Sequence, residues 1–285
     1  MSERPSDRFL QCGQRRLDLA RTRVMGVLNV TPDSFSDGGT YMSDGVPDLA
    51  RIHERAVAMI EAGAAVLDVG GESTRPGSDP VTAKIELERV MPVVEGLLKL
   101  DTIVSVDTRK PEVAQAVLAA GCHMINDVSG LSNAGMRAVL AESDAAICIM
   151  HMRGEPRTMQ HEPCYEDVVA EVREALRQRV DEAERAGIDH RRLCIDPGFG
   201  FGKTPAHNLA LLKSLEALRI DDLPMLVGLS RKRTIGSITG RPVASRLAGS
   251  LAAAIIAAQG GADVVRVHDV AETVDALKIL EAVES

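Results

Sequence analysis

The sequence predicts a single closed (β/α)8 TIM barrel with a short N-terminal hairpin. Three observations support this fold class: eight short apolar runs alternate with eight segments of helical periodicity, several helical segments end at glycine, and no linker of disordered composition divides the chain. Continuous apolar strands that alternate with helices are typical of a parallel sheet covered by helices. An open doubly wound sheet fits less well, because the eight units follow without a break. We therefore expect an N-terminal extension over residues 1–21 and one barrel domain over residues 22–285.

The predicted elements follow one another in a regular order. A loose alternation of apolar residues around Cys12 and Gly13 predicts the hairpin over residues 8–19. Strands are expected at 24–30, 65–69, 102–106, 123–125, 145–150, 192–195, 225–229 and 263–267. Helices are expected at 48–62, 84–98, 111–119, 133–142, 166–186, 205–218, 245–259 and 270–282.

The segments that follow the strands are longer and more polar than those that follow the helices. Five of them are rich in glycine and polar residues, at 31–47, 70–82, 151–165, 197–204 and 230–244. In a barrel these segments all open on the C-terminal face, where active sites lie. The asymmetry therefore predicts that one face carries the chemistry.

Composition and charge narrow the class of protein. A net charge of −8 without a long basic block argues against general affinity for nucleic acid or an anionic membrane. Five widely spaced cysteines predict neither a disulfide framework nor a zinc site. The N-terminus lacks an apolar segment of signal length, and the apolar run at 247–258 is too short to span a bilayer. We expect a cytoplasmic protein with reduced thiols.

The segment at 195–204, IDPGFGFGKT, places a carboxylate at the end of a strand, followed by a glycine-rich loop. A nucleotide P-loop is excluded because Pro197 stands where glycine is required, and a dinucleotide fingerprint fails because Lys203 replaces its third glycine. Glycine lets a backbone approach a ligand closely, but it also serves in ordinary turns. Both readings of this loop, a ligand site and a tight turn with packed rings, remain open from these residues alone.

Nearly every predicted strand ends in a polar residue. Asp107, Asn126 and Asp196, with Lys232, offer the donors and acceptors that suit a flat heterocycle. A second set suits an oxyanion such as a phosphate, with charge-assisted bonds and a metal-held water: Asn29, Arg75, Arg266 and His268.

Other polar residues near the strand ends have simpler readings. Asp68 and Asp127, taken singly, are better read as helix caps or loop hydrogen bonds. The histidines without metal spacing, such as His151 and His161, are read as loop or core residues. Of the three cations at 231–233, one is expected to point inward and the others to be solvated.

Taken together, the loop sequences form a family signature. They read NVTPDSFSDGG (29–39), DVGGESTRPG (68–77), SVDT (105–108), INDVSG (125–130), MHMRGEPRTMQ (150–160), DPGFGFGK (196–203), GLSRK (228–232) and RVHDV (266–270). From about residue 22 to residue 282 the chain closely resembles the dihydropteroate synthases of folate biosynthesis. The resemblance implies a transferase that joins 6-hydroxymethyl-7,8-dihydropterin pyrophosphate to para-aminobenzoate, giving 7,8-dihydropteroate and pyrophosphate.

The resemblance also implies roles for individual residues. It gives the catalytic set as Asp107, Asp196, Lys232, Arg266 and His268. It gives the pterin contacts as Asp107, Asn126, Val128, Met150, Asp196, Phe201, Gly228, Lys232 and Arg266. It gives the pyrophosphate contacts as Asn29, Thr74, Arg75, Arg266 and His268, with Asn29 also helping to bind Mg2+. It gives the para-aminobenzoate contacts as Phe35, Ser73, Thr74, Pro76, Phe201 and Lys232. A homodimer and inhibition by sulfonamides, as mimics of para-aminobenzoate, are further implications.

The residues fit a dissociative, SN1-like path in which Mg2+ and cationic side chains stabilise the leaving pyrophosphate. Two alternatives remain open. A methyltetrahydrofolate-dependent methyltransferase would share the pterin contacts but would not need the TRPG loop or the RVHDV segment. A non-catalytic pterin-binding paralogue would keep the fold and lack turnover. A generic phosphate-binding barrel ranks last, since it leaves Asp107, Asn126 and Asp196 unexplained.

Overall fold

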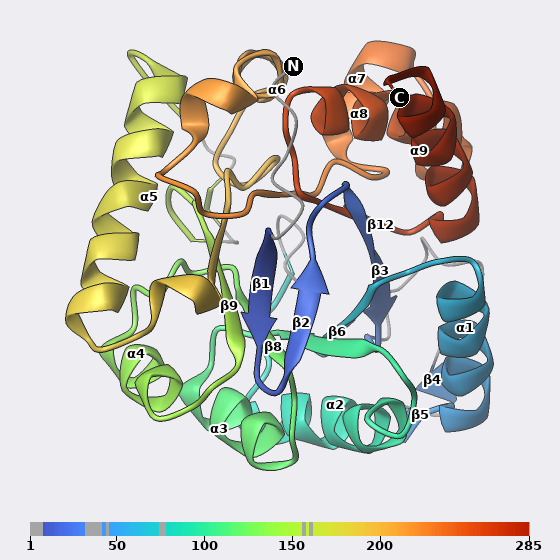
Figure 1. Cartoon of the computed structure of the whole chain (residues 1–285), viewed down its shortest axis with the longest axis vertical. Helices are drawn as coiled ribbons and strands as arrows, with labels where there is room; N and C mark the ends of the chain where they lie inside the picture. Colours follow the sequence, from blue (N-terminus) through green and yellow to red (C-terminus); the bar gives the residue numbers. More distant parts are fainter. Residues whose placement is uncertain are drawn as a thin grey trace.

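Eight parallel strands form a closed barrel in the computed structural model, which describes residues 8–31, 42–43, 46–73, 78–155, 158–159 and 162–284. The strands are β3 (Arg23–Asn29), β6 (Val66–Gly70), β7 (Ile103–Asp107), β8 (Met124–Asp127), β9 (Ala146–Met150), β10 (Leu193–Asp196), β11 (Leu226–Val227) and β12 (Val264–Val267). Their order is β10-β9-β8-β7-β6-β3-β12-β11, and a parallel bridge from Ile195 to Met225 closes the barrel between its two end strands. The predicted fold class is confirmed (Figure 1).

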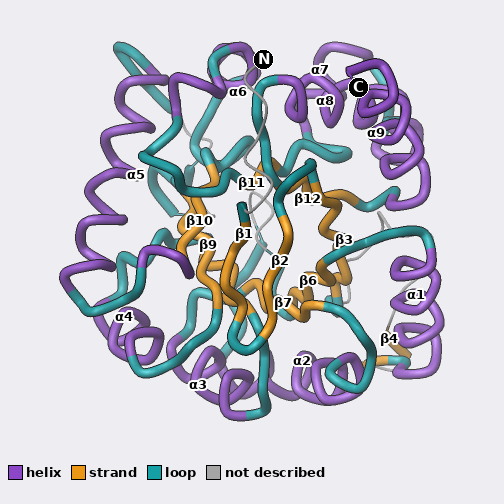
Figure 2. Tube along the Cα trace, in the orientation of Figure 1, coloured by secondary structure: helices purple, strands orange, loops and turns teal. Residues whose placement is uncertain are grey.

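Helices surround the barrel on its outside (Figures 1 and 2). They are α1 (Leu49–Glu61), α2 (Ala83–Leu97), α3 (Pro111–Ala119), α4 (Ala134–Ala141), α5 (Val168–Arg185), α6 (Pro205–Lys213), α7 (Arg233–Thr239), α8 (Leu247–Gln259) and α9 (Val270–Glu284). The predicted helix at 205–218 is divided into α6 and the 3₁₀ helix η3 (Leu215–Leu218), and a further 3₁₀ helix, η2 (His190–Arg192), precedes β10. The other predicted helices match observed ones to within a few residues.

Two predicted loops contain regular structure. The segment at 230–244 includes α7 and the start of the 3₁₀ helix η4 (Val243–Ser245), so its reading as a loop is wrong. Gly236 weakens the helical signal of α7, yet a Cβ there would lie 2.1 Å from Nη2 of Arg246. The first long loop contains a strand pair, β4 (Met42–Ser43) and β5 (Val46–Pro47), that the sequence did not predict.

The predicted hairpin is present and seals one end of the barrel. Strands β1 (Phe9–Cys12) and β2 (Arg15–Asp18) pair antiparallel and lie across the middle of the barrel in Figure 1. Leu10 and Leu17 pack in a buried apolar cluster with side chains from the beginnings of the barrel strands. The members from those strands include Met25, Val66, Ile103, Met124, Ala146, Leu226 and Val264. We call this the closed end of the barrel, because apolar side chains fill it.

A second and larger apolar core lies between the strands and the helices. Leu67 and Val69 of β6 belong to it, whereas Asp68 and Gly70 alternate with them and face the barrel interior. Since each strand ends on the opposite side from the hairpin, the open end of the barrel collects the strand-end residues.

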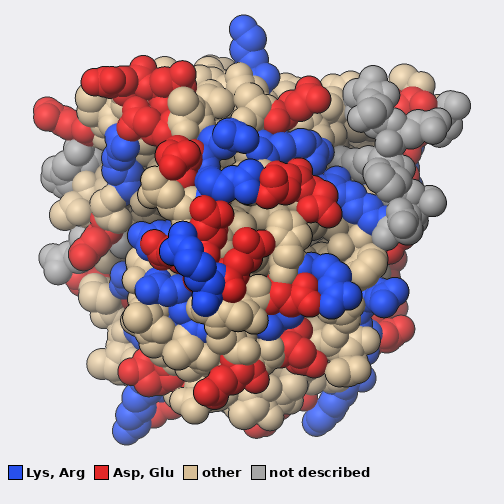
Figure 3. All heavy atoms as spheres, turned by 60° about the vertical axis from the view of Figure 1, so that its left-hand side comes forward, with Lys and Arg blue, Asp and Glu red and all other residues tan. Residues whose placement is uncertain are grey.

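The outer surface has no single charge. Lys and Arg are interspersed with Asp and Glu on the face shown in Figure 3, which includes the side that carries α5. Within the described ranges, no helix is long and apolar enough to cross a membrane. All five cysteines are free thiols, and only Cys164 is exposed.

Candidate active site

Residues from four neighbouring strands stand in one row at the open end of the barrel, and three of them are polar. Asn29 of β3 is the register partner of Gly70 in β6, Gly70 that of Asp107 in β7, and Asp107 that of Asn126 in β8. Residues aligned across parallel strands point to the same face. Because Gly70 has no side chain, Oδ1 of Asn29 lies only 3.2 Å from the position a Cβ would occupy there. The row therefore has a gap between Asn29 and Asp107.

Asp68 is the centre of the polar network below this row. Its buried carboxylate accepts hydrogen bonds from Oγ of Ser105 at 2.6 Å, Nδ2 of Asn126 at 3.1 Å and Nε of Arg266 at 2.6 Å. These partners lie on three other strands, so the reading of Asp68 as a helix cap or loop hydrogen bond is wrong. A carboxylate inside an otherwise apolar strand is costly to bury without partners, and that signal could have identified it.

Two carboxylates orient Arg266. Its Nη2 donates to Oδ2 of Asp107 at 3.1 Å, while Nε is bound to Asp68. Burial alone would lower the pKa of Arg266, but Asp68 and Asp107 raise it above its usual range. Burial raises the pKa of Asp107 to about 7, and Arg266 opposes that shift. Near neutral pH, Asp107 can therefore exist with or without its proton.

Asn126 has an acceptor without a partner. Its Nδ2 is bound to Asp68, whereas its buried Oδ1 has no hydrogen bond to any part of the chain that the structure describes. An unsatisfied buried carbonyl costs about 1–3 kcal/mol. The structure therefore offers an acceptor at the open end for an N–H or O–H group of a ligand.

The glycine loop after β10 completes the site. Oδ1 of Asp196 accepts from the backbone N–H of Gly198 at 2.7 Å. Nζ of Lys232 donates to the carbonyl of Phe199 at 2.7 Å and lies 4.7 Å from the centre of the Phe201 ring. Burial raises the pKa of Asp196, with Lys232 opposing, and burial lowers the pKa of Lys232 to about 8, with Asp196 opposing.

The remaining barrel positions cluster around these groups. Gly228 lies beside both Lys232 and Arg266: a Cβ there would be 3.7 Å from Nζ of Lys232 and 3.8 Å from Cβ of Arg266. Met150, at the end of β9, and Val128, just after β8, are buried apolar residues. They could pack against a flat ring held by the polar groups.

The cations and His268 are arranged by local contacts. Nδ1 of His268 lies 3.0 Å from Oγ of Ser230. The backbone carbonyl of His268 accepts a hydrogen bond from Nη2 of Arg55 at 3.0 Å. Arg231 forms an ion pair with Asp269, so the expectation that it is solvated is wrong, whereas Arg233 is exposed. Lys232 is the cation of the three that points inward.

Other residues that the sequence analysis singled out lie away from the centre of the site. Asp127 accepts from Ser129 and Leu131 in its own loop, which confirms the loop reading. Glu72 accepts from Nζ of Lys110 at 2.6 Å and from the N–H of Val81, so it ties together both ends of the second long loop. Ser73 follows it, with its carbonyl bound by Ser78. The predicted contacts Phe35, Thr74, Arg75 and Pro76, and also His161, lie outside the described residues.

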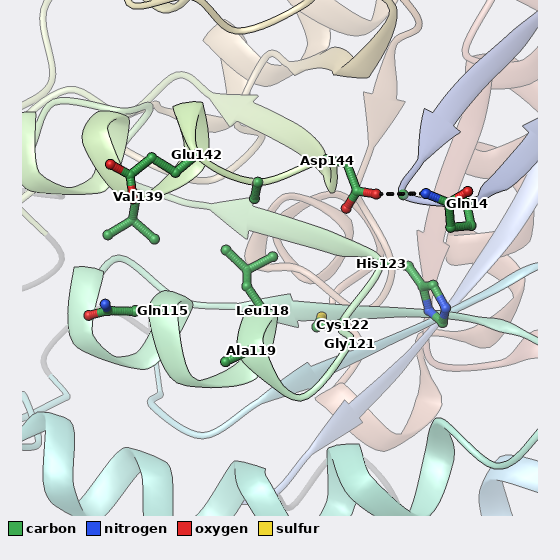
Figure 4. Close-up of a pocket in the computed structure, with 12 residues that line it drawn as sticks. Gln14, Gln115, Leu118, Ala119, Gly121, Cys122, His123, Val139, Glu142 and Asp144 are labelled. Carbon is green, nitrogen blue, oxygen red and sulfur yellow. Dashed lines mark hydrogen bonds between the residues drawn. The ribbon is translucent and has the colours of Figure 1, made fainter.

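A pocket of about 770 Å³ lies elsewhere, between the C-terminal parts of α3 and α4 and the hairpin turn (Figure 4). Gln14, His123 and Asp144 line it. His123 directly precedes β8, and Asp144 lies shortly before β9. The pocket therefore lies on the hairpin side of the molecule, at the closed end of the barrel, and is separate from the residues at the strand ends. No sequence pattern predicts this pocket.

Comparisons with known proteins identify relatives of the chain. Residues 25–268 match the family described as pterin binding enzyme. The dihydropteroate synthase of Escherichia coli (strain K12) is 49% identical over 267 residues, which cover 93% of each protein. The Yersinia pestis dihydropteroate synthase, in a sulfonamide drug complex, has a TM-score of 0.91 at 45% identity, covering 97% of this chain and 99% of that one. The Burkholderia cenocepacia enzyme, complexed with 7,8-dihydropteroate, has a TM-score of 0.86 at 46% identity, covering 97% and 96%.

Proposed function

The chain belongs to the dihydropteroate synthase family of transferases, and on that premise we propose how its open end carries out the reaction. The substrates are 6-hydroxymethyl-7,8-dihydropterin pyrophosphate and para-aminobenzoate. The product bound by the Burkholderia cenocepacia relative, 7,8-dihydropteroate, contains both halves. Transfer of a pterinylmethyl group to the arylamine forms that product and releases pyrophosphate.

The single observation that carries the pterin assignment is the unpaired Oδ1 of Asn126. It lies in a row with Asp107, and Asp196 and Lys232 stand on the adjoining part of the barrel mouth. A pterin ring has several edge N–H groups and ring acceptors, so it needs this mixture of carboxylate, amide and ammonium. Met150, Val128 and Phe201 supply apolar surface for its faces.

The bond that breaks joins the methylene carbon to a pyrophosphate oxygen, and its electron pair leaves with the pyrophosphate. The dihydropterin ring then carries positive charge, which the carboxylates of Asp107 and Asp196 stabilise. The neutral amine of para-aminobenzoate attacks the carbon, forms the C–N bond and afterwards loses a proton. Because the arylamine is a weak base, correct positioning supplies most of the remaining rate enhancement.

Asn29, Arg266 and His268 are the described residues that we assign to the pyrophosphate end. The family implies Mg2+, which usually keeps several waters and is held by substrate phosphates with one or two protein oxygens. The residues fit this mode: Asn29 offers one amide oxygen beside the side-chain gap at Gly70. In the described residues no group of three or more His, Cys, Asp and Glu forms a metal cage. Bound Mg2+ would neutralise charge on pyrophosphate, while Asn29 and His268 orient it.

We assign para-aminobenzoate to the neighbourhood of Phe201 and Lys232, and we add Ser73 because the family resemblance implies it. Lys232 lies over the Phe201 ring, and this arrangement supports a role in placing the aromatic amine above the pterin. Phe35, Thr74, Arg75 and Pro76 keep the roles that the family resemblance implies.

We also propose a cytoplasmic homodimer. The five free thiols support a reducing compartment. Three large apolar side chains are exposed on α7, η4 and α8, namely Ile238, Val243 and Ile256, and α7 packs on α8. Exposed apolar surface of this kind suits a subunit interface. Sedimentation equilibrium tests the dimer, and Ile256→Glu is expected to shift it toward monomer.

The experiment that tests the function follows pyrophosphate release from dihydropterin pyrophosphate, with and without para-aminobenzoate and with and without Mg2+. We expect release to require Mg2+ and to be matched by dihydropteroate formation. Calorimetric binding of the pterin without any release would favour the non-catalytic paralogue. Methyl transfer from methyltetrahydrofolate, without dihydropteroate formation, would favour the methyltransferase.

A further inference from the structure

Lys203, at the end of the glycine loop, is a buried lysine. Only 2% of the surface of Lys203 is exposed. Its Nζ donates to the carbonyls of Gly198 and Phe201, both at 3.0 Å, and lies 2.9 Å from Nδ1 of His151. A fourth and longer contact, at 3.3 Å, reaches the carbonyl of His151. Burial lowers the pKa of Lys203 to about 7, and the carboxylate of Asp196 opposes that shift. In its protonated form the amine is an ammonium with three N–H donors, and the three shorter contacts use all of them.

His151 is suited to accept from this ammonium. Burial and the charge of Lys203 lower the pKa of His151 to about 3, so its ring is neutral at ordinary pH. A neutral ring leaves the Nδ1 lone pair free to accept a hydrogen bond. His151 follows β9, whereas Gly198 and Phe201 follow β10. Lys203 therefore joins the loops of two neighbouring strands.

The same two loops are in direct backbone contact. Gly198 has φ of +69°, and a Cβ there would lie 1.8 Å from the carbonyl oxygen of His151. Gly202 has φ of +63°, and a Cβ there would lie 2.3 Å from the carbonyl oxygen of Arg153. No larger residue fits at either position without movement. The loop is packed against its neighbour at the two places on either side of Phe201.

Backbone groups of the glycine loop that bind Lys203 lie next to backbone groups that bind Asp196 and Lys232. Lys203 binds the carbonyl of Gly198, while the N–H of Gly198 donates to Asp196. Lys203 binds the carbonyl of Phe201, while the carbonyl of Phe199 accepts from Lys232. A shift of this short loop would therefore move the partners of Asp196 and Lys232 and the ring of Phe201 together.

We propose that Lys203 is a positioning residue for the pterin site, in which its ammonium takes the place of a bound cation among three acceptors and fixes the loop that supports Asp196, Lys232 and Phe201. It acts through the loop, since its own side chain is buried. This inference rests on the proposed function, because it assumes that the pterin binds against these residues. Groups that orient the ligands of metal sites typically change affinity or activity by about 10–100-fold when removed, and we take that range for Lys203.

The test compares four variants of the full chain. Lys203→Met removes the ammonium and keeps most of the stem, whereas Lys203→Ala leaves space for an added alkylammonium ion. Lys213→Met, at the exposed end of α6, is the matched control. For each variant we would measure KM for dihydropterin pyrophosphate, kcat and circular dichroism. The Lys203→Ala and Asp196→Asn variants would be measured with and without ethylammonium.

We expect KM to rise about 10–100-fold in Lys203→Met, with a smaller change in kcat and an unchanged dichroism spectrum. Ethylammonium is expected to lower KM in Lys203→Ala and to have no effect on Asp196→Asn. The Lys213→Met control is expected to match the parent. This rescue separates a positioning ammonium from a purely structural side chain.

Three outcomes would overturn the inference: a KM equal to that of the parent in Lys203→Met, a KM in Lys203→Ala that ethylammonium leaves unchanged, or loss of the fold in both Lys203 variants. The last outcome would make Lys203 a residue of the core and not of the site. Failure of the parent protein itself to form dihydropteroate would instead count against the proposed function.

Discussion

The two ends of the barrel interior differ in chemistry although the same strands build both. Strand β7 places Ile103 in the apolar cluster at the closed end and Asp107 in the polar row at the open end, with Ser105 between them. Apolar burial stabilises the closed end at about 25 cal/mol per Å². At the open end, buried charges are stable only because Asp68, Asp107 and Arg266 compensate one another. One strand can therefore contribute apolar burial at its beginning and polar site groups at its end.

The largest effect is expected from Asp68→Ala, which removes the carboxylate at the centre of the polar network at the open end. The variant leaves Arg266 with one carboxylate fewer and frees Nδ2 of Asn126. Removing one partner of a buried ion pair typically costs about 3–5 kcal/mol. Urea unfolding would measure the loss, and calorimetry should show weaker pterin binding. Surface substitutions usually change the free energy of unfolding by no more than about 0.5 kcal/mol. A change that small in Asp68→Ala would contradict a stabilising role for the Asp68 network.

A smaller effect is expected from Leu17→Ala at the closed end. Its side chain packs within the cluster that the hairpin seals, and truncating a buried leucine costs about 2–5 kcal/mol. Because the change lies far along the strands from the polar row, pterin affinity per folded molecule should stay the same. The same urea and calorimetry measurements test both statements. A matched loss of pterin affinity would mean that the two ends are not independent.

The smallest expected effect is a pH dependence confined to the open end. The pKa of Asp107 is raised from 3.8 to about 7, and that of Lys232 is lowered from 10.5 to about 8. Pterin affinity should therefore be highest near pH 7. It should fall on the acid side as Asp107 is protonated, and on the alkaline side as Lys203, whose pKa burial lowers to about 7, and then Lys232 lose their protons. The folded protein binds a proton at Asp107 that the unfolded chain has released, so the stability from this group is lost as pH rises through about 7.

Calorimetry from about pH 5.5 to about pH 9.5 measures this dependence. In Asp107→Asn the fall on the acid side should disappear, while the fall on the alkaline side remains. A flat profile in the parent would contradict the roles of both groups. Leu17→Ala should reproduce the parent profile.

Apolar periodicity predicted the barrel because strands buried on both faces are continuous apolar runs. It missed α7, since Gly236, which makes room for Arg246, lowers the helical signal of a short segment. The polar strand ends predicted a cluster of polar groups at one end of the barrel, and the structure brings Asp107, Asn126 and Arg266 together there. A carboxylate within an apolar strand marks Asp68 as a residue that needs partners, but which three partners it has could not be predicted, because they depend on the register of separate strands. Lys203 looks like an ordinary loop cation until the fold brings carbonyls and His151 around it.

The most direct test of the account is calorimetric titration of a pterin into the parent, Asp196→Asn and Leu17→Ala side by side. Asp196 stands at the open end, where its carboxylate is the proposed acceptor, and Leu17 stands at the closed end. We predict that affinity falls at least about tenfold, or about 1.4 kcal/mol, in Asp196→Asn and stays at the parent value in Leu17→Ala. Equal affinity in the parent and Asp196→Asn would contradict the assignment of the pterin site to the open end of the barrel.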